Sequence, residues 1–244
     1  MKKTYIFLTL LYVLVFCGII LFGIWSGRTA DVLAENVPLQ NRHCFIIDAG
    51  HGGPDGGAVS CTGVYESHIN LEIALRLNDL MHLLGYETKM IRTTDVSVYT
   101  SGDTIAGKKA SDLKERVKIV NETDNAILLS IHQNHFSDSY YKGAQMFYPK
   151  TEGSKELAVA LQNAFVNSLN PNSHRQAKPV QGLYLMRNIH KTGVLIECGF
   201  LSNYEEEAKL RVGEYQQKIC CVIASVCSQY LLDRAGDSWY NNSI

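Results

Sequence analysis

Short apolar runs alternate with segments of helical periodicity along most of this chain. Residues 44–48 read Cys-Phe-Ile-Ile-Asp, which is typical of a buried strand, whereas Ile69, Ile73 and Leu77 recur at helical spacing. The predicted strands are 44–48, 87–92, 126–132, 143–148, 182–186 and 194–197. The predicted helices are 69–84, 111–123, 157–168 and 215–230. This alternation predicts a single α/β domain with about six strands in a mostly parallel or mixed sheet and helices on both faces.

The amino-terminal pattern is different. Lys2 and Lys3 precede an uncharged, strongly apolar run over residues 4–27. Because a run of about 20 apolar residues spans a bilayer, we expect a transmembrane anchor with the lysines in the cytoplasm. A signal peptide cleaved near residues 32–34 is the alternative. The predicted organisation is therefore an anchor or signal at 1–27, a linker at 28–42, a catalytic domain at 43–232 and a tail at 233–244.

Composition excludes some classes of protein. The 244 residues are 46% hydrophobic and carry a formal net charge of −1. Disorder is excluded by this apolar content, and no basic patch indicates a nucleic-acid partner. Seven cysteines include no CxxC pair, so we expect most of them to be free. Cys220, Cys221 and Cys227 are expected to act as small hydrophobic residues of one helix.

Residues capable of chemistry follow three of the predicted strands. Strand 44–48 leads to Asp48 and His51, strand 126–132 ends at His132, and strand 194–197 ends at Glu197. Sites in open α/β sheets form at the carboxyl ends of strands, so these residues are expected to converge. Glu66 opens the first helix after a glycine-rich loop and is expected at the same edge.

Two histidines and one carboxylate form a ligand set that zinc uses in catalytic sites. We expect His51, Glu66 and His132 to bind one Zn²⁺ per chain, and Glu197 to move protons between water and a leaving amine. Asp48 is interpreted either as a hydrogen-bond acceptor at the strand end or as a residue that orients a ligand histidine.

Other interpretations of these residues stay open at this point. A single histidine at a strand end is often only a hydrogen-bonding loop residue, and Glu197 would pair with an arginine in a purely structural role. His68 and His135 lie close to the candidate ligands and compete with them. The glycine-rich loop matches neither of the phosphate-binding patterns GxxxxGK[ST] and GxGxxG.

An ordered series of motifs is similar to the zinc-dependent N-acetylmuramoyl-L-alanine amidases of amidase family 3. The resemblance covers about residues 43–232. The matching segments are 47–58, 63–66, 70–75, 92–95, 116–121, 129–134, 143–148 and 194–203.

This resemblance implies zinc on His51, Glu66 and His132, with Glu197 as the catalytic carboxylate. It also implies a six-stranded sheet and cleavage of the amide between muramic acid and L-alanine in peptidoglycan. Candidates for positioning these groups or contacting substrate are Asp48, Asn70, Arg116 and Asn134.

The sequence departs from the family pattern at three positions without losing a catalytic group. Gln133 and Val120 stand where alanine is common, and Cys198 replaces a small residue after Glu197. We expect Cys198 to narrow the site or to approach the metal.

The layout of an anchored catalytic domain without wall-binding repeats is most similar to the spore-cortex amidases of the CwlD type. That resemblance implies an extracytoplasmic enzyme, at the membrane or secreted, in the forespore or spore envelope. It would prepare cortex muramic-δ-lactam for germination, and a regulatory protein is a candidate partner. The alternatives are a vegetative autolysin, a zinc carboxypeptidase that uses Arg92 or Arg116 to bind a terminal carboxylate, and a wall-binding protein without turnover.

Overall fold

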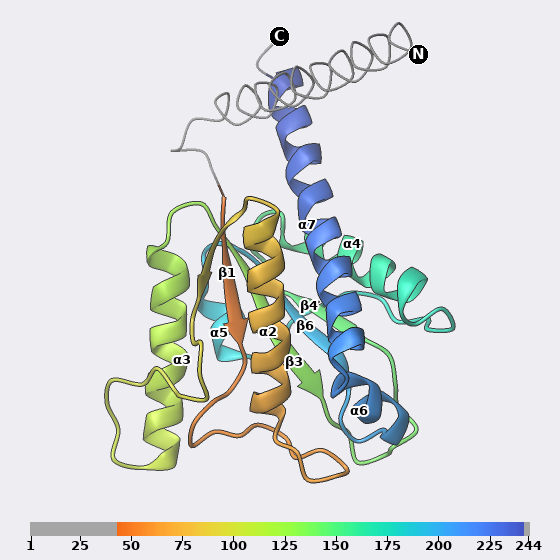
Figure 1. Ribbon diagram of the computed structural model, residues 1–244. Helices are drawn as coiled ribbons and strands as arrows, with labels where there is room; N and C mark the ends of the chain where they lie inside the picture. The colour runs from red at the N-terminus through yellow and green to blue at the C-terminus, as the bar shows by residue number, and fades with distance from the viewer. Residues whose placement is uncertain (1–42, 242–244) are drawn as a thin grey trace, which may run out of the picture. The chain divides into compact units, whose positions relative to one another are not determined.

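The computed structural model describes residues 43–241, with side chains up to residue 235. Its centre is a six-stranded sheet with the strand order β2-β1-β3-β6-β4-β5 (Figure 1). Strands β2, β1, β3 and β6 are parallel, β4 is antiparallel to β6, and β5 is parallel to β4. The predicted mixed sheet is confirmed. The strands are β1 Cys44–Ala49, β2 Glu87–Met90, β3 Ala126–Asn134, β4 Gln145–Tyr148, β5 Lys178–Pro179 and β6 Thr192–Phe200.

Helices cover both faces of this sheet because successive strand residues point to opposite faces. Phe45 and Ile47 of β1 join one buried cluster with α2, α4, α6 and α7, whereas Ile46 joins a second with α3 and α5. Each large side chain buried in this way contributes about 1.5–3 kcal/mol to folding. The helices are α2 Glu66–Leu83, α3 Ile105–Glu122, α4 Ser154–Ser168, α5 Tyr184–Asn188, α6 Tyr204–Leu210 and α7 Gly213–Asn241.

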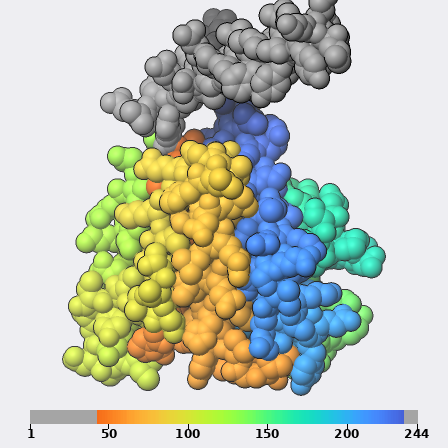
Figure 2. Space-filling view, in the orientation of Figure 1, coloured from red at the N-terminus to blue at the C-terminus, as the bar shows by residue number. Residues whose placement is uncertain are grey.

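Helices α2 and α7 lie side by side on the first face (Figure 2). Gln216 of α7 joins them through polar contacts as well as apolar packing. It accepts a hydrogen bond from Arg76 Nε at 2.8 Å and donates one to Glu72 Oε2 at 2.8 Å. These contacts hold the middle of α2 against α7.

The register of the central strands brings their carboxyl ends to one edge. Asp48 of β1 lies opposite Ser130 of β3, and His132 of β3 lies opposite Glu197 of β6. Because β4 runs in the other direction, its first residue, Gln145, is the register partner of Glu197. Segments that precede β4 and β5 therefore lie at the same edge as segments that follow β1, β3 and β6.

The fifth predicted strand is wrong. Residues 182–186 do not form a strand, since Tyr184–Asn188 is helix α5 and the strand that follows β4 is Lys178–Pro179. Leu185, Met186 and Ile189 form an apolar face at helical spacing that packs against the second cluster. A short apolar run fits either structure, and this packing surface selects the helix.

All four predicted helices are longer than expected, and α3 and α7 differ most. Helix α3 begins at Ile105, inside a segment expected to be a loop, because Thr104 Oγ1 caps it by accepting a hydrogen bond from Gly107 N at 3.0 Å. Helix α7 runs to Asn241, through most of the expected tail.

The proposed anchor or signal at 1–27 and the linker at 28–42 lie outside the described residues. None of the helices α2 to α7, which make up the described part, combines the length and the apolarity needed to cross a bilayer. The prediction of free cysteines is confirmed for the described chain, where all six cysteines are free. Cys220 and Cys227 are buried as expected, but Cys221 is exposed.

Candidate metal centre

His51 occupies a strained turn directly after β1. It is one of two described non-glycine residues with positive φ, at 61°, a conformation that persists only when surrounding contacts impose it. Two such contacts hold the turn. Gly50 N donates to Ile131 O at 3.0 Å, and Arg116 Nη2 donates to His51 O at 2.8 Å. The imidazole is thereby directed across the carboxyl end of the sheet.

Glu66 is the first residue of α2, and its carboxylate is held by three donors. Gln133 N and Asn70 Nδ2 each donate to Oε1 at 3.1 Å, and Ala58 N donates to Oε2 at 3.0 Å. The residue is only 4% exposed. A carboxylate fixed in this way presents its remaining lone pairs in one direction.

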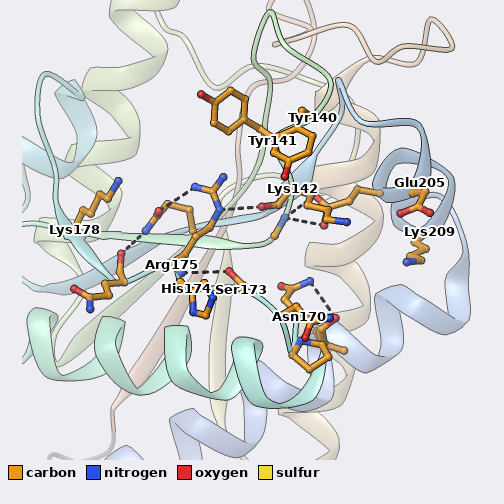
Figure 3. A pocket seen from close by; sticks show the side chains of 17 residues that line it. Tyr140, Tyr141, Lys142, Asn170, Ser173, His174, Arg175, Lys178, Glu205 and Lys209 are labelled. Carbon is orange, nitrogen blue, oxygen red and sulfur yellow. Dashed lines mark hydrogen bonds between the residues drawn. The ribbon is translucent and has the colours of Figure 1, made fainter.

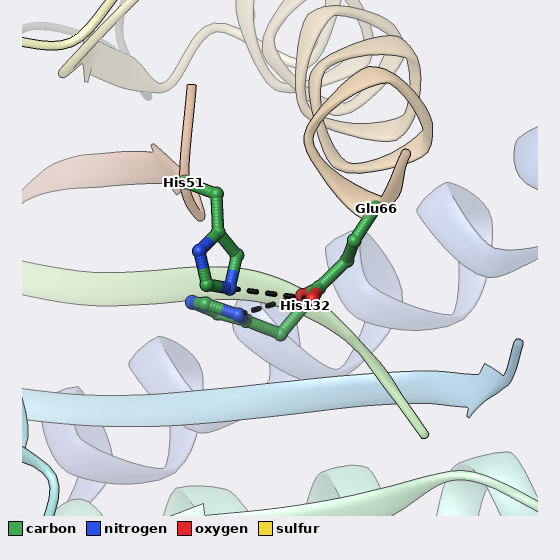
Figure 4. A group of neighbouring side chains, drawn as sticks. All are labelled: His51, Glu66 and His132. Carbon is green, nitrogen blue, oxygen red and sulfur yellow. Dashed lines mark hydrogen bonds and ion pairs between the residues drawn. The ribbon is translucent and has the colours of Figure 1, made fainter. Parts of the chain in front are cut away.

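His132 completes a group of three potential ligands (Figure 4). Its Nδ1 lies 3.0 Å from Glu66 Oε1, and His51 Nε2 lies 3.3 Å from Glu66 Oε2. One ligand atom from each residue lies within 4.8 Å of the others, so the group could hold a metal ion. The structure thus brings together the three residues that the sequence proposed as ligands.

Two glycines leave the space that these side chains occupy. A Cβ at Gly50 would lie 2.2 Å from the His132 ring, and a Cβ at Gly57 would lie 2.6 Å from Glu66 Oε2. Gly57 also has a φ of +70°, which disfavours other residues. The glycines of this loop therefore allow the backbone to lie close to the His132 and Glu66 side chains.

Asp55 orients His51 and was given no role by the sequence analysis. Its Oδ2 lies 3.0 Å from His51 Nδ1 and 3.0 Å from Lys109 Nζ. A hydrogen bond from Nδ1 leaves Nε2 free to act as a ligand, the usual function of a carboxylate behind a ligating histidine. The sequence signal that could have identified Asp55 is its position, four residues after His51 within the glycine-rich loop.

The metal-free group is strongly coupled electrostatically. Burial by itself would lower the pKa of His51, but hydrogen bonds to Asp55 and Glu66 raise it to about 9. Burial would likewise raise the pKa of Glu66, but His132 and His51 hold it far below its usual range. The hydrogen bond from His51 lowers the pKa of Asp55 in the same way. The two carboxylates therefore favour a positive charge at His51, where a bound cation would take the place of the proton.

Asp48 does not contact a ligand histidine by a hydrogen bond. It forms a buried ion pair with Arg116 and accepts a hydrogen bond from Ser130 Oγ at 2.6 Å. Arg116 also bonds Asp112 at 2.6 Å. Of the two interpretations of Asp48, the structure supports the acceptor at the strand end. Asp48 affects the site through Arg116, which donates a hydrogen bond to the carbonyl oxygen of His51.

Glu197 projects from β6 beside His132. Its Oε2 is buried and has no hydrogen-bond partner within the described chain. Burial, reinforced by Glu66 and opposed by the two histidines, raises its pKa to about 7. The structural alternative, an ion pair with an arginine, does not occur among the described residues. A buried carboxyl group without a partner is instead suited to proton transfer.

The remaining candidate residues differ in whether they contact the metal group. Asn70 reaches the site, because it donates to Glu66 and also to Gly50 O at 3.2 Å. Asn134 ends β3, and its carbonyl accepts from Leu201 N at 2.8 Å. His68 pairs with Asp95 at 3.2 Å, and His135 is exposed; neither joins the metal group.

Cys198 is buried in the apolar cluster with Ile196, points to the sheet face opposite to that of its neighbour Glu197, and is not part of the metal group.

The two arginines considered for a carboxypeptidase are committed to the protein itself. Arg92 donates to Ala49 O at 2.8 Å, Gly50 O at 3.0 Å and Ser67 O at 2.8 Å. Arg116 is bonded as described above and is only 2% exposed. Neither guanidinium is available to a terminal carboxylate of a substrate.

An α/β sheet that gathers two histidines from its strand ends and one glutamate from a helix start beside a carboxyl group with a buried oxygen is suited to metal-assisted hydrolysis. Comparison with known proteins specifies the class. The profile of the N-acetylmuramoyl-L-alanine amidase family (Amidase_3) matches residues 45–227, and the chain belongs to this family.

Comparisons with individual proteins support this family assignment. The germination-specific N-acetylmuramoyl-L-alanine amidase of Bacillus subtilis is 35% identical over 201 residues, covering 82% of this chain and 84% of the relative. The structure of the CwlD amidase from Clostridioides difficile in complex with the GerS lipoprotein has a TM-score of 0.75 at 37% identity, covering 78% and 98%. An N-acetylmuramoyl-L-alanine amidase from Clostridium difficile 630 has a TM-score of 0.67 at 31% identity, covering 78% and 97%. The protein is therefore a peptidoglycan amidase, not a carboxypeptidase or a binding protein.

Proposed function

We propose that this amidase is zinc-dependent and acts on spore-cortex peptidoglycan, where its product leads to muramic-δ-lactam and supports germination. One observation supports the catalytic part of this proposal. The side chains of His51, Glu66 and His132 converge next to the unpartnered Oε2 of Glu197. A site built only for stability would not leave a buried carboxylate oxygen without a donor.

The donor set fits zinc. Two imidazole nitrogens and one carboxylate oxygen are the ligands of open zinc sites in hydrolases, and Asp55 and Asn70 orient two of them. Zinc held there supplies a nucleophile from water at neutral pH and polarises the scissile carbonyl group.

Glu197 is proposed to carry the proton. Its Oε2 accepts a proton from the attacking water and then donates it to the amine of L-alanine as the amide breaks. Burial raises the pKa of Glu197 to about 7, which strengthens the carboxylate as a base for the first of these steps. Bound zinc, as a nearby cation, would draw that pKa down and favour the carboxylate that starts the cycle.

The cortex assignment is supported by the two relatives named as germination-specific and CwlD. We propose by extension that the enzyme works outside the cytoplasm, held or exported by residues 1–27. The complex of the CwlD relative with a lipoprotein supports the proposal that this enzyme also binds a protein partner, for which we propose a regulatory role.

Two experiments test the proposal. Purified peptidoglycan digested with the enzyme, with and without a chelator, should release L-alanine amino termini only when the metal is present. Equal release in the chelator-treated and zinc-restored samples would contradict zinc dependence. Muropeptides from spores lacking the protein should contain no muramic-δ-lactam, whereas normal lactam content would favour the vegetative autolysin.

A further inference from the structure

A cavity of about 670 Å³ (Figure 3) is lined by segments that lie at the same sheet edge as the metal centre, on the β4 side of β6. Its walls come from the segment before β4, the segment before β5, and α6. Gln145 links it to the catalytic group, because it lines the cavity and is the register partner of Glu197. The cavity thus begins one strand away from the proposed proton carrier.

Arg175 occupies the middle of this cavity (Figure 3). Its guanidinium lies 4.8 Å from the centre of the Phe200 ring, donates from Nε to Lys142 O at 2.9 Å, and donates from Nη1 to Gln145 Oε1 at 3.3 Å. These contacts fix the plane of the group. They leave Nη2 without a hydrogen bond to any described residue.

This guanidinium forms no ion pair among the described residues. Burial lowers the pKa of Arg175, and the charge of nearby Glu206 only partly opposes that shift. Glu206 lies in the same wall, but its two oxygens accept from Gly143 N at 2.9 Å, and Oε2 also accepts from Phe200 N at 2.9 Å. The wall also carries Lys142, Lys178 and Lys209. A half-buried, oriented and unpaired guanidinium is suited to bidentate binding of a carboxylate.

We propose that this cavity is the stem-peptide subsite and that Arg175 binds a free carboxylate of the peptide that leaves. This inference rests on the amidase activity assigned above. The positive charge of Arg175 decides which half of the substrate binds in the cavity. The glycan half near the scissile amide is an uncharged N-acetyl sugar, whereas the peptide half carries free carboxylates.

The spacing agrees with this assignment. Neighbouring strands lie about 4.8 Å apart, and Arg175 is bonded to a side chain of the strand next to β6. An extended peptide advances about 3.5 Å per residue, so a stem peptide that crosses from β6 to the neighbouring strand reaches the guanidinium within its first few residues. Arg175 is therefore a specificity-determining residue for the peptide half.

The test uses two soluble substrates and the full-length protein with its zinc. One is an N-acetylmuramoyl tripeptide with free stem carboxylates, and the other is the same compound with those carboxylates converted to primary amides. Arg175→Gln should raise KM for the acid substrate about tenfold, the effect of losing one charge-assisted hydrogen bond, and leave KM for the amide substrate unchanged. Arg175→Lys should recover part of the loss. Arg187→Gln, at an exposed arginine of α5, is the matched control and should behave as wild type.

The outcomes distinguish failure of the carboxylate subsite from failure of the amidase activity. Equal KM changes for both substrates, or no change for either, would overturn the carboxylate subsite while the amidase activity stands. Wild-type protein that cleaves neither substrate would overturn the amidase activity and this inference with it. Retained cleavage of the amide substrate by Arg175→Gln shows that the variant is folded.

Discussion

Asp55 Oδ2 lies 3.0 Å from His51 Nδ1, on the side of the ring opposite to Glu66. This contact fixes which nitrogen of His51 faces the other ligands. It also links the first ligand to α3, because the same oxygen binds Lys109. The geometry of the metal centre thus depends on a residue that is not itself a ligand.

Replacing Asp55 should therefore weaken metal binding without removing a ligand. We expect Asp55→Ala to lower zinc affinity about 10- to 100-fold, the usual effect of losing the carboxylate behind a ligating histidine. Competition with a chromogenic chelator measures this affinity. Asp103→Ala, at an exposed position, is the control. Unchanged affinity in Asp55→Ala would show that the turn alone orients His51.

Glu197→Gln should separate chemistry from metal binding. The amide cannot accept the proton from water, so we expect hydrolysis to fall by about 10²- to 10⁴-fold while zinc content stays at that of wild type. His132→Ala should lose both zinc and activity. Elemental analysis and peptidoglycan digestion measure the two quantities. Wild-type turnover in Glu197→Gln would rule out its proposed role.

Gly50→Ala tests the space left for His132. The new Cβ would lie 2.2 Å from the imidazole, so the ring must move and the three ligands separate. We expect loss of zinc with the fold retained. Gly107→Ala, in helix α3, meets no atom closer than 3.2 Å and should keep its zinc. Zinc content and circular dichroism, measured on both variants, distinguish local displacement of the ring from unfolding.

Asp48 should make stability depend on acid pH. Burial opposes its charge, but Arg116 above all holds the pKa of Asp48 below its usual range. Because the folded pKa is depressed, the stabilisation is present above the unfolded value of about 3.9 and is lost as pH falls through the folded pKa. Asp48→Asn should lower the free energy of unfolding by about 3 kcal/mol at pH 7, the scale of breaking a buried pair.

Urea unfolding at pH 7 and pH 3 measures this difference, which should be smaller at pH 3. Asp103→Asn serves as the surface control. A difference between wild type and Asp48→Asn that stays constant from pH 7 to pH 3 would contradict the assignment of the charge to Asp48.

The free cysteines should differ in reactivity. Cys221 is exposed, whereas burial raises the pKa of Cys227 to about 12 and removes its thiol from solvent. A brief pulse of iodoacetamide on the native protein should label Cys221 and spare Cys198 and Cys227, as peptide mass spectrometry would show. Denatured protein, the reference sample, should be labelled at all three. Fast labelling of Cys227 in the native state would mean that α7 opens locally.

The sequence by itself determined the class of fold and the main chemistry of the site. The apolar runs 44–48, 126–132 and 194–197 indicate buried strands, and His51, His132 and Glu197 follow or end them in that order. It did not determine the structure of 182–186, because the short run Gly-Leu-Tyr-Leu-Met has no β-branched residue and is compatible with a strand or a helix until its packing partner is known.

Tertiary structure decided everything that depends on contacts between distant segments. Register placed Glu197 opposite His132, and the turn at His51 exposed its Nδ1 to Asp55. The tertiary fold also committed Arg116 to Asp48 and left Arg175 unpaired in a cavity beside Gln145. Residue type specifies which groups can exchange protons or bind ions. Which of them are paired, buried or free follows only from packing, because desolvation and hydrogen bonding act over a few ångströms in space.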